Sequence, residues 1–93
     1  KGNSGDFERF FQAQVLWDET MADGIARFVQ ANPDFQVIVL AGQGHIAYGY
    51  GIPSRVARRL DNIVQRTILL NPSEPTPPRG EQAAADLFWF TFK

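Results

Sequence analysis

The run FQVIVLAG, residues 35–42, constrains the fold more than any other stretch of this chain. It is apolar, rich in β-branched residues and closed by glycine, a pattern typical of a strand covered on both faces in a parallel sheet. Parallel strands are joined by crossover connections that usually contain a helix. We therefore expect an α/β domain with helices on either side of this strand in the sequence.

Residues 6–31 are expected to form one long amphipathic helix that Asp6 or Ser4 can cap. Asn32 precedes a proline and is expected to end it. Gln14 and Asp18 lie within about 20° of Phe7 and Ile25, at the centre of the apolar stripe, and are predicted to face inward. The apolar positions of the stripe are Phe7, Phe10, Phe11, Met21, Ala22, Ile25, Phe28 and Val29.

The second half of the chain predicts one shorter helix and two more strands. Residues 54–66 have a helical apolar face and Ser54 as a natural N-cap, and TILL, residues 67–70, is typical of a strand, which completes a right-handed βαβ unit. The closing DLFWFTFK is a strand that is apolar on both faces and needs cover on both. The expected fold is α/β: a small, mostly parallel sheet of about three strands packed against one long and one shorter helix, in the order α-β-α-β-β.

The length and composition predict a single small domain, residues 1–93, with a Pro-rich irregular connection at residues 71–82. The net charge of −1 argues against a nucleic-acid partner. The absence of cysteine excludes disulfides, Cys-ligated zinc and iron–sulfur clusters. No apolar run reaches the ~20 residues of a spanning helix, and the chain is expected to be a mature domain or an excised fragment.

Four of the eight glycines lie in the loop that follows the first expected strand. Gly42, Gly44 and Ala47 match the dinucleotide fingerprint G-x-G-x-x-G/A, and Asp61 lies at the distance expected of a ribose-binding acid. That fingerprint requires a helix that begins within it, whereas here the helix is expected only near Ser54. A nucleotide site is therefore not favoured.

The loop also holds His45, the only histidine of the chain. It lies among small residues at the carboxyl end of a strand, which is where open α/β sheets bind ligands. Histidine is the commonest metal ligand, and the hydroxyls of Tyr48 and Tyr50 nearby can ligate ferric iron. The alternative is a histidine that only hydrogen-bonds its own loop.

Asp18 is expected to orient the His45 ring if the long helix packs on the sheet, because a buried carboxylate needs a partner. Two alternatives remain: Asp18 pairs with an arginine of the second helix, or the helix rotates and exposes it. Glu19 lies about 100° further round the helix and is expected to be solvated.

Three arginines, Arg55, Arg58 and Arg59, cluster in the first turns of the second expected helix. A helix amino end and guanidinium groups both favour carboxylates or phosphates. Arg55, beside the loop, is the best candidate for an anion such as a haem propionate. The alternative is a solvated basic face.

Taken together, AQVLWDETMADGIARFV, VIVLAGQGHIAYGYGIPSRVARRL and the terminal AADLFWF resemble the carboxy-terminal part of the ChaN-like haem-binding family, in the superfamily of the Tiki and TraB proteins. The resemblance implies an α/β domain in haem and iron uptake at the bacterial cell envelope, often a lipoprotein whose anchor would lie outside this chain. It implies haem held by Tyr and His side chains within one chain or shared across a homodimer. Family domains are more than twice this length, so part of the site can lie elsewhere.

Carried over by position, His45 matches the family's G-H histidine and Gln14, Asp18, Glu19 and Met21 match its helix motif. The expected site has His45 at the iron beside Gly44, with Tyr48, Tyr50 or a tyrosine outside the chain as second ligand. It also has Met21 in an apolar wall, Arg55 near a propionate, and Asp18 and Gln14 behind the histidine. The alternatives are a Tiki-type hydrolase fragment with His45 and Asp18 at a divalent metal, or a folded domain without a site. No catalytic residue is assigned, since catalytic zinc typically uses three protein ligands.

Overall fold

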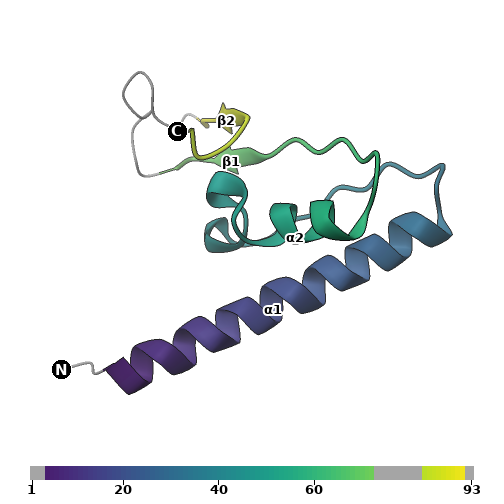
Figure 1. Cartoon of the computed structure of the whole chain (residues 1–93). Coiled ribbons are helices and arrows are strands. Elements are labelled where there is room, and N and C mark those ends of the chain that lie inside the picture. Colours follow the sequence, from purple (N-terminus) through teal and green to yellow (C-terminus); the bar gives the residue numbers. More distant parts are fainter. Residues whose placement is uncertain (1–3, 73–82, 92–93) are drawn as a thin grey trace.

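The computed structural model describes residues 4–72 and 83–91 as a mixture of helix and strand. Its elements are α1 (Ser4–Ala31), two 3-10 turns η1 (Gln43–His45) and η2 (Ala47–Gly49), α2 (Ile52–Arg59), β1 (Ile68–Leu70) and β2 (Leu87–Trp89). Figure 1 shows α2 lying between the long α1 and the two strands. The expected α/β class is confirmed in this general form. No helix within the described ranges is long and apolar enough to cross a membrane.

The long amino-terminal helix is confirmed as α1, and Asn32 ends it. The Asn32 side-chain amide donates to the Phe28 carbonyl at 2.9 Å, and its backbone N–H donates to the same oxygen at 2.9 Å. The Phe28 carbonyl thus accepts its ordinary helical bond from the backbone and a second bond from the side chain. Pro33, which follows, cannot continue the helical ladder.

The core lies where α1 meets α2. Ala22 is fully buried against Ile52 and Val56, and Met21 and Ile25 pack around them. The small Ala22 side chain allows the two helices to approach closely, and its burial with two branched aliphatic residues supplies the apolar area that holds them together.

Only part of the apolar stripe of α1 is covered, which corrects the expectation that all of it faces inward. Phe7, Phe10 and Phe11 are 67%, 68% and 54% exposed. A helix of eight residues such as α2 is about 12 Å long, whereas the 28 residues of α1 extend about 42 Å. The amino-terminal turns of α1 therefore project beyond the rest of the described chain (Figure 1).

The first expected strand is not formed, so the prediction of three strands is wrong for the described residues. Residues 35–42 carry no strand assignment, and none of the backbone hydrogen bonds within the described ranges joins residues 36–41 to another segment. A ladder requires a neighbour that offers its own N–H and C=O groups. The observed order is α-α-β-β, without the expected βαβ unit.

The second helix is shorter than the expected range of 54–66. It begins at Ile52 with Pro53 in its first turn, and it ends at Arg59 because Leu60 is extended and Asn62 has φ = 58°. Ser54 is not its N-cap: the Ser54 hydroxyl donates to the carbonyls of Tyr50 (3.2 Å) and Gly51 (3.3 Å). The N-cap is Gly51.

The two strands pair in parallel, with Ile68 opposite Leu87 and Leu70 opposite Trp89. Leu69 is buried, whereas these four neighbours are exposed, so one face of the sheet is covered and the other is not. At the start of the ladder, the Asp86 carboxylate accepts from the Thr67 backbone N–H at 2.7 Å. Most of the predicted Pro-rich connection, residues 73–82, lies outside the described residues.

Candidate functional site

His45 lies at the end of η1, in a loop that folds back tightly on itself. A Cβ on Gly51 would meet the His45 carbonyl carbon at 2.8 Å and its Cα at 3.1 Å. Real Cβ atoms do not approach backbone this closely, so the close approach requires glycine at position 51. In the sequence, only its place in the glycine-rich loop distinguishes Gly51, and its role was not predicted.

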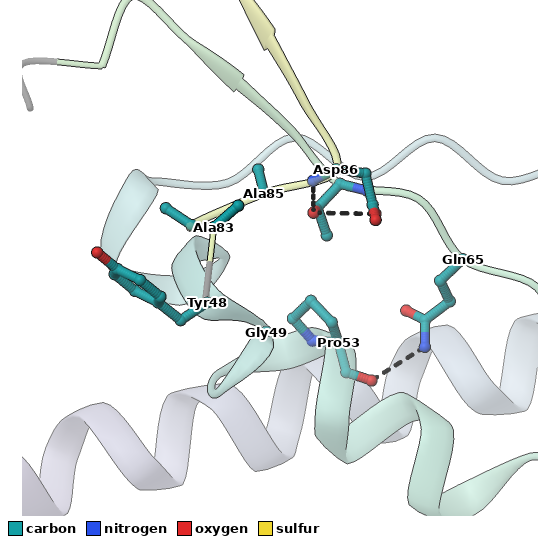
Figure 2. A pocket seen from close by; sticks show the side chains of 9 residues that line it. Tyr48, Gly49, Pro53, Gln65, Ala83, Ala85 and Asp86 are labelled. Atoms are coloured by element: carbon teal, nitrogen blue, oxygen red, sulfur yellow. Dashed lines mark hydrogen bonds between the residues drawn. The ribbon is translucent and has the colours of Figure 1, made fainter. Parts of the chain in front are cut away.

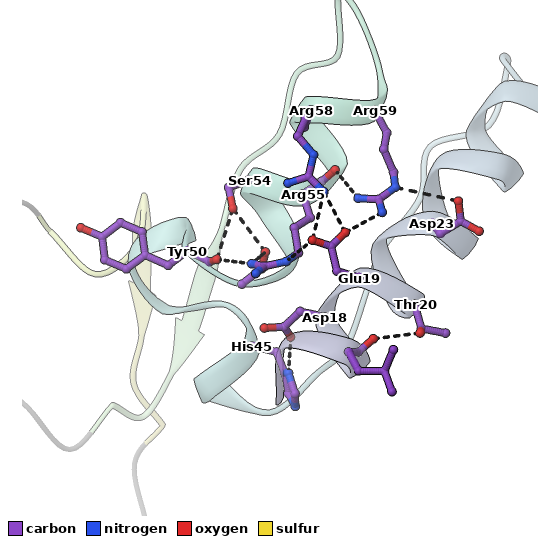
Figure 3. A network of polar contacts seen from close by, with 12 residues as sticks. Asp18, Glu19, Thr20, Asp23, His45, Tyr50, Ser54, Arg55, Arg58 and Arg59 are labelled. Atoms are coloured by element: carbon purple, nitrogen blue, oxygen red, sulfur yellow. Dashed lines mark hydrogen bonds and ion pairs between the residues drawn. The ribbon is translucent and has the colours of Figure 1, made fainter. Parts of the chain in front are cut away.

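Asp18 contacts the His45 ring directly (Figure 3). Its Oδ1 atom lies 2.5 Å from His45 Nδ1, and the two side chains are only 6% and 17% exposed. A contact this short between an oxygen and a nitrogen needs a shared proton, and the ionised carboxylate has none to give. We therefore assign Nδ1–H as the donor to Asp18; in the neutral form of the ring this tautomer carries its lone pair on Nε2.

Gln14 holds the loop from the neighbouring turn of α1. Its Nε2 donates to the Gly44 carbonyl at 3.4 Å and lies 3.2 Å from His45 Nδ1. Since Nδ1 already donates to Asp18, the Gln14 amide serves the loop carbonyl and does not bind the ring nitrogen. A Cβ on Gly44 would lie 3.8 Å from this amide, so Gly44 stands in ordinary contact with Gln14. Both polar residues of the stripe thus face inward, as expected.

Trp17 is part of this arrangement, and the sequence analysis missed it. Its ring centroid lies 6.4 Å from that of His45, with 26° between the ring planes, and Trp17 is 62% exposed. The available signal was its position beside Asp18, on the edge of the inward stripe. His45 therefore contacts the Asp18 carboxylate and has the exposed Trp17 ring as its neighbour.

Glu19 binds all three arginines of α2, which corrects the expectation that it is solvated (Figure 3). Its carboxylate lies 3.0 Å from Arg55 Nε, 2.8 Å from Arg58 Nη2 and 2.6 Å from Arg59 Nη2. Hydrogen bonds from Arg59 and then Arg58 lower the pKa of the Glu19 carboxyl to about 2. Burial opposes this shift, and the hydrogen bond from Arg55 contributes least. The arginines thus clamp α2 to α1 through Glu19, and Asp18 remains with the histidine.

Arg55 also fastens the loop. Its Nη1 donates to the carbonyls of Tyr50 (2.6 Å) and Gly51 (3.2 Å), and its side chain is 18% exposed. The residue predicted for a propionate is therefore already bound to one carboxylate and two carbonyls. Arg58 is the most exposed of the three guanidinium groups, at 60%.

Tyr48 and Tyr50 stack on each other, with ring centroids 6.1 Å apart and 21° between their planes. Tyr48 has φ = 60°, an uncommon conformation for a bulky residue, and its backbone N–H donates to the Ala84 carbonyl at 2.6 Å. In Figure 3 the Tyr50 ring points away from the Asp18–His45 pair.

A pocket of about 380 Å³ lies beside Tyr48, between the loop and the segment that precedes β2 (Figure 2). His45 is not among the residues that line it, which are Tyr48, Gly49, Pro53, Gln65, Thr67, Ala83, Ala84, Ala85 and Asp86. Of the two predicted tyrosines, Tyr48 thus lines a hollow on another part of the loop, and Tyr50 is not among its lining residues.

Met21 packs against the buried core formed by Ala22, Ile52 and Val56, so it supports the helix pair. For the divalent-metal alternative, residues 4–72 and 83–91 contain no group of three or more His, Asp or Glu side chains that could hold an ion. Within these ranges, His45 and Asp18 form a pair of such side chains without a third.

One protein-family model matches this chain. The family model described as haem-binding uptake, Tiki superfamily, ChaN matches residues 1–56, more than half of the chain. The chain belongs to this family. The match includes α1, His45 and both tyrosines, so the ChaN-like motifs predicted from the sequence coincide with the site built by Asp18 and His45.

One relative of this chain is a plant protein whose name describes it as chloroplastic. The chain is 31% identical over 85 residues to the protein RETICULATA-RELATED 5, chloroplastic, of Arabidopsis thaliana. The match covers 86% of this chain and 12% of that protein, so this ChaN-like chain spans about an eighth of its relative's length. No solved structure matches the chain.

Proposed function

We propose that this chain is a haem-binding module of a protein that takes up or handles haem, in which His45 Nε2 would bind the iron. The observation that carries the proposal is the hydrogen bond between Asp18 and His45 Nδ1. Metal-ligating histidines typically donate their other ring N–H to a carboxylate, which fixes the tautomer and raises the basicity of the ligating nitrogen. The bound haem would supply an iron centre that needs such a ligand.

The family identity supports haem as the cofactor, and the residues present fit it. A neutral imidazole with its second nitrogen already bound is a suitable donor to haem iron. Trp17 offers an exposed aromatic surface beside the ring. Gly44 adds no side chain next to the histidine. Met21, proposed for an apolar wall, packs against the core between the two helices.

For a second ligand we propose Tyr48 or Tyr50, either within the chain or from the other chain of a homodimer that shares the haem. Phenolate oxygen is an established ligand of haem iron. The Tyr50 ring points away from His45 in Figure 3. If two chains share the haem, the histidine of one chain and a tyrosine of the other can both bind it, so the two side chains need not converge within a single chain.

We place a propionate near Arg55, at the corner where three guanidinium groups face two carboxylates, those of Glu19 and Asp23. The excess of positive charge attracts a further carboxylate. The family resemblance places such proteins at the bacterial cell envelope, whereas the Arabidopsis relative is named as chloroplastic.

Haemin titration followed by absorbance tests the proposal. We expect a shifted Soret band on binding, and His45→Ala is expected to change its position and weaken binding at least about tenfold, the range typical for lost ligand support. Arg27→Ala, on an exposed part of α1, is the matched control and should bind haemin as the parent does. Absence of a Soret shift, or an unchanged spectrum and affinity in His45→Ala, would overturn the proposal.

Tyr48→Phe and Tyr50→Phe, each compared with the parent, identify the oxygen ligand. The variant that lacks the ligand should lose the charge-transfer absorption of a phenolate bound to ferric iron while it keeps the His45-dependent binding. If both variants retain it, neither tyrosine is the ligand.

A further inference from the structure

The buried Asp18 carboxylate contacts the His45 ring without an arginine beside it (Figure 3). Its side chain is 6% exposed, and in the part of the chain that the structure describes its ion-pair partner is the histidine alone. The arginines of α2 bind Glu19 instead, and Arg59 also lies 3.8 Å from Asp23. The negative charge of Asp18 is therefore directed at the imidazole, and no guanidinium group in the described chain neutralises it.

This carboxylate changes the electronic character of the ring. A hydrogen bond to an ionised acceptor is roughly twice as strong as one between neutral groups, and a buried setting strengthens it further. When His45 Nδ1–H donates to Asp18, electron density moves toward Nε2, and the ring gains part of the character of an anion. Nε2 is then a stronger electron donor than the same atom of a histidine without such a partner.

A stronger donor does not stabilise the two oxidation states of haem iron equally. Ferric iron carries one more positive charge than ferrous iron, so a ligand with added negative charge stabilises the ferric state more. Hydrogen bonding behind the ligand is one of the means by which a protein sets the reduction potential of haem. The Asp18–His45 pair should therefore favour the ferric state.

We infer that Asp18 makes this module selective for ferric over ferrous haem and lowers the reduction potential of the bound haem. The inference rests on the proposed function, since it requires that His45 binds the iron. Asp18 acts through the His45 ring and does not itself touch the haem, so it is a positioning residue.

The arginine corner opposes this effect and is the weaker influence. Its three guanidinium groups face the carboxylates of Glu19 and Asp23, which leaves an excess of positive charge. Arg58 is 60% exposed, and water and salt screen an exposed charge. Asp18 is buried in direct contact with the ring, where its charge acts over a shorter distance and through a less polarisable medium.

Redox titration of the haemin-loaded chain, followed by absorbance without oxygen, tests the inference. Asp18→Asn keeps the size of the side chain and removes its charge. We expect its preference for ferric over ferrous haem to fall by about tenfold. The midpoint potential should then rise by about 59 mV, the one-electron equivalent of a tenfold change. Asp34→Asn removes the same charge from the exposed turn after α1 and should keep the parent's potential.

Gln14→Ala distinguishes an electronic role from a merely structural one. The Gln14 amide is uncharged and holds the loop through the Gly44 carbonyl. Its loss should weaken the binding of haemin and of haem reduced with dithionite to the same extent, so the midpoint potential should stay near that of the parent. Asp18→Glu keeps the charge and should stay closer to the parent's potential than Asp18→Asn does.

The possible outcomes separate this inference from the proposed function. Haemin that binds through His45 with one midpoint potential in the parent and in Asp18→Asn would overturn the inference and leave the proposed function intact. An equal loss of ferric and ferrous haem in Asp18→Asn, or an equal rise in potential in Gln14→Ala or Asp34→Asn, would also contradict it.

The parent chain gives a test that does not depend on the folding of any variant. It should bind haemin more tightly than haem reduced with dithionite, and equal affinities for the two would overturn the inference. Absence of a Soret shift with haemin in the parent would overturn both the inference and the proposed function.

Discussion

Asp18 and Glu19 are adjacent in α1 and bind different parts of the molecule. Asp18 Oδ1 lies 2.5 Å from His45 Nδ1, whereas the Glu19 carboxylate binds Arg55, Arg58 and Arg59 of α2. One residue along a helix rotates a side chain by about 100°, which is enough to direct one carboxylate to the loop and the next to the second helix. The candidate site and the clamp that holds it are therefore built from consecutive residues.

Substitution Asp18→Asn should weaken haemin binding by about 10-fold to 100-fold, the usual cost of losing the partner of a ligating histidine. The amide is neutral and also offers a donor, so it no longer selects the Nδ1–H tautomer. Haemin titration measures the loss, and Asp34→Asn, in the exposed turn after α1, is the control. Parent-like affinity in Asp18→Asn would show that the carboxylate has no part in binding.

Substitution Glu19→Gln should lower the thermal midpoint of unfolding. The variant leaves three guanidinium groups close together without the charge that binds them, and like charges at this distance repel. Circular dichroism follows the transition, with Glu8→Gln, on the exposed amino-terminal turns of α1, as the control. Equal midpoints for the two variants would mean that the arginine cluster does not hold α2 against α1.

The Glu19 carboxylate should make the free energy of unfolding depend on pH. Its pKa is lowered to about 2 in the folded chain, while an unpaired glutamate has a pKa of about 4.3. The contribution of the ionised Glu19 carboxylate to stability is therefore complete well above the unfolded-state pKa, and it is lost as the pH falls from about 5 toward 2. Denaturant unfolding over this range should show a decline in the parent that Glu19→Gln lacks. Added salt should reduce the difference, because the ion pairs are partly exposed.

Substitution Gly51→Ala should destabilise the fold by about 1–3 kcal/mol, the range for forcing atoms into occupied space. Its Cβ would collide with the backbone of His45, so haemin binding should weaken as well. Gly24→Ala is the opposite case: nothing lies within 4 Å of its Cβ, and alanine should stabilise α1 by about 1 kcal/mol. Denaturant unfolding of both variants measures the free energy of unfolding, which should fall for Gly51→Ala and rise for Gly24→Ala. An unchanged free energy for Gly51→Ala would contradict the close contact.

Local patterns predicted several elements well. The apolar spacing and Asn32-Pro33 predicted α1 nearly to its ends. The TILL and DLFWFTFK runs contain the two observed strands, and the position of Asp18 on the helical stripe predicted that it faces the loop. Each of these depends on neighbours within a few residues. Pairing of residues 35–42 and the length of α2 depend instead on distant partners and on the left-handed Asn62, and there the predictions were wrong.

The sequence by itself determined the family, the helical stripe that carries Gln14 and Asp18, and the histidine in a loop of glycines. Periodicity and short motifs are enough for these, because they are properties of consecutive residues. Only the tertiary structure decided that Asp18 binds His45 and that Glu19 binds the arginines, and it separated the tyrosine pocket from the histidine. Two carboxylates one residue apart are chemically equivalent in a sequence, and only the packing of α1 against the loop and α2 gives them different partners.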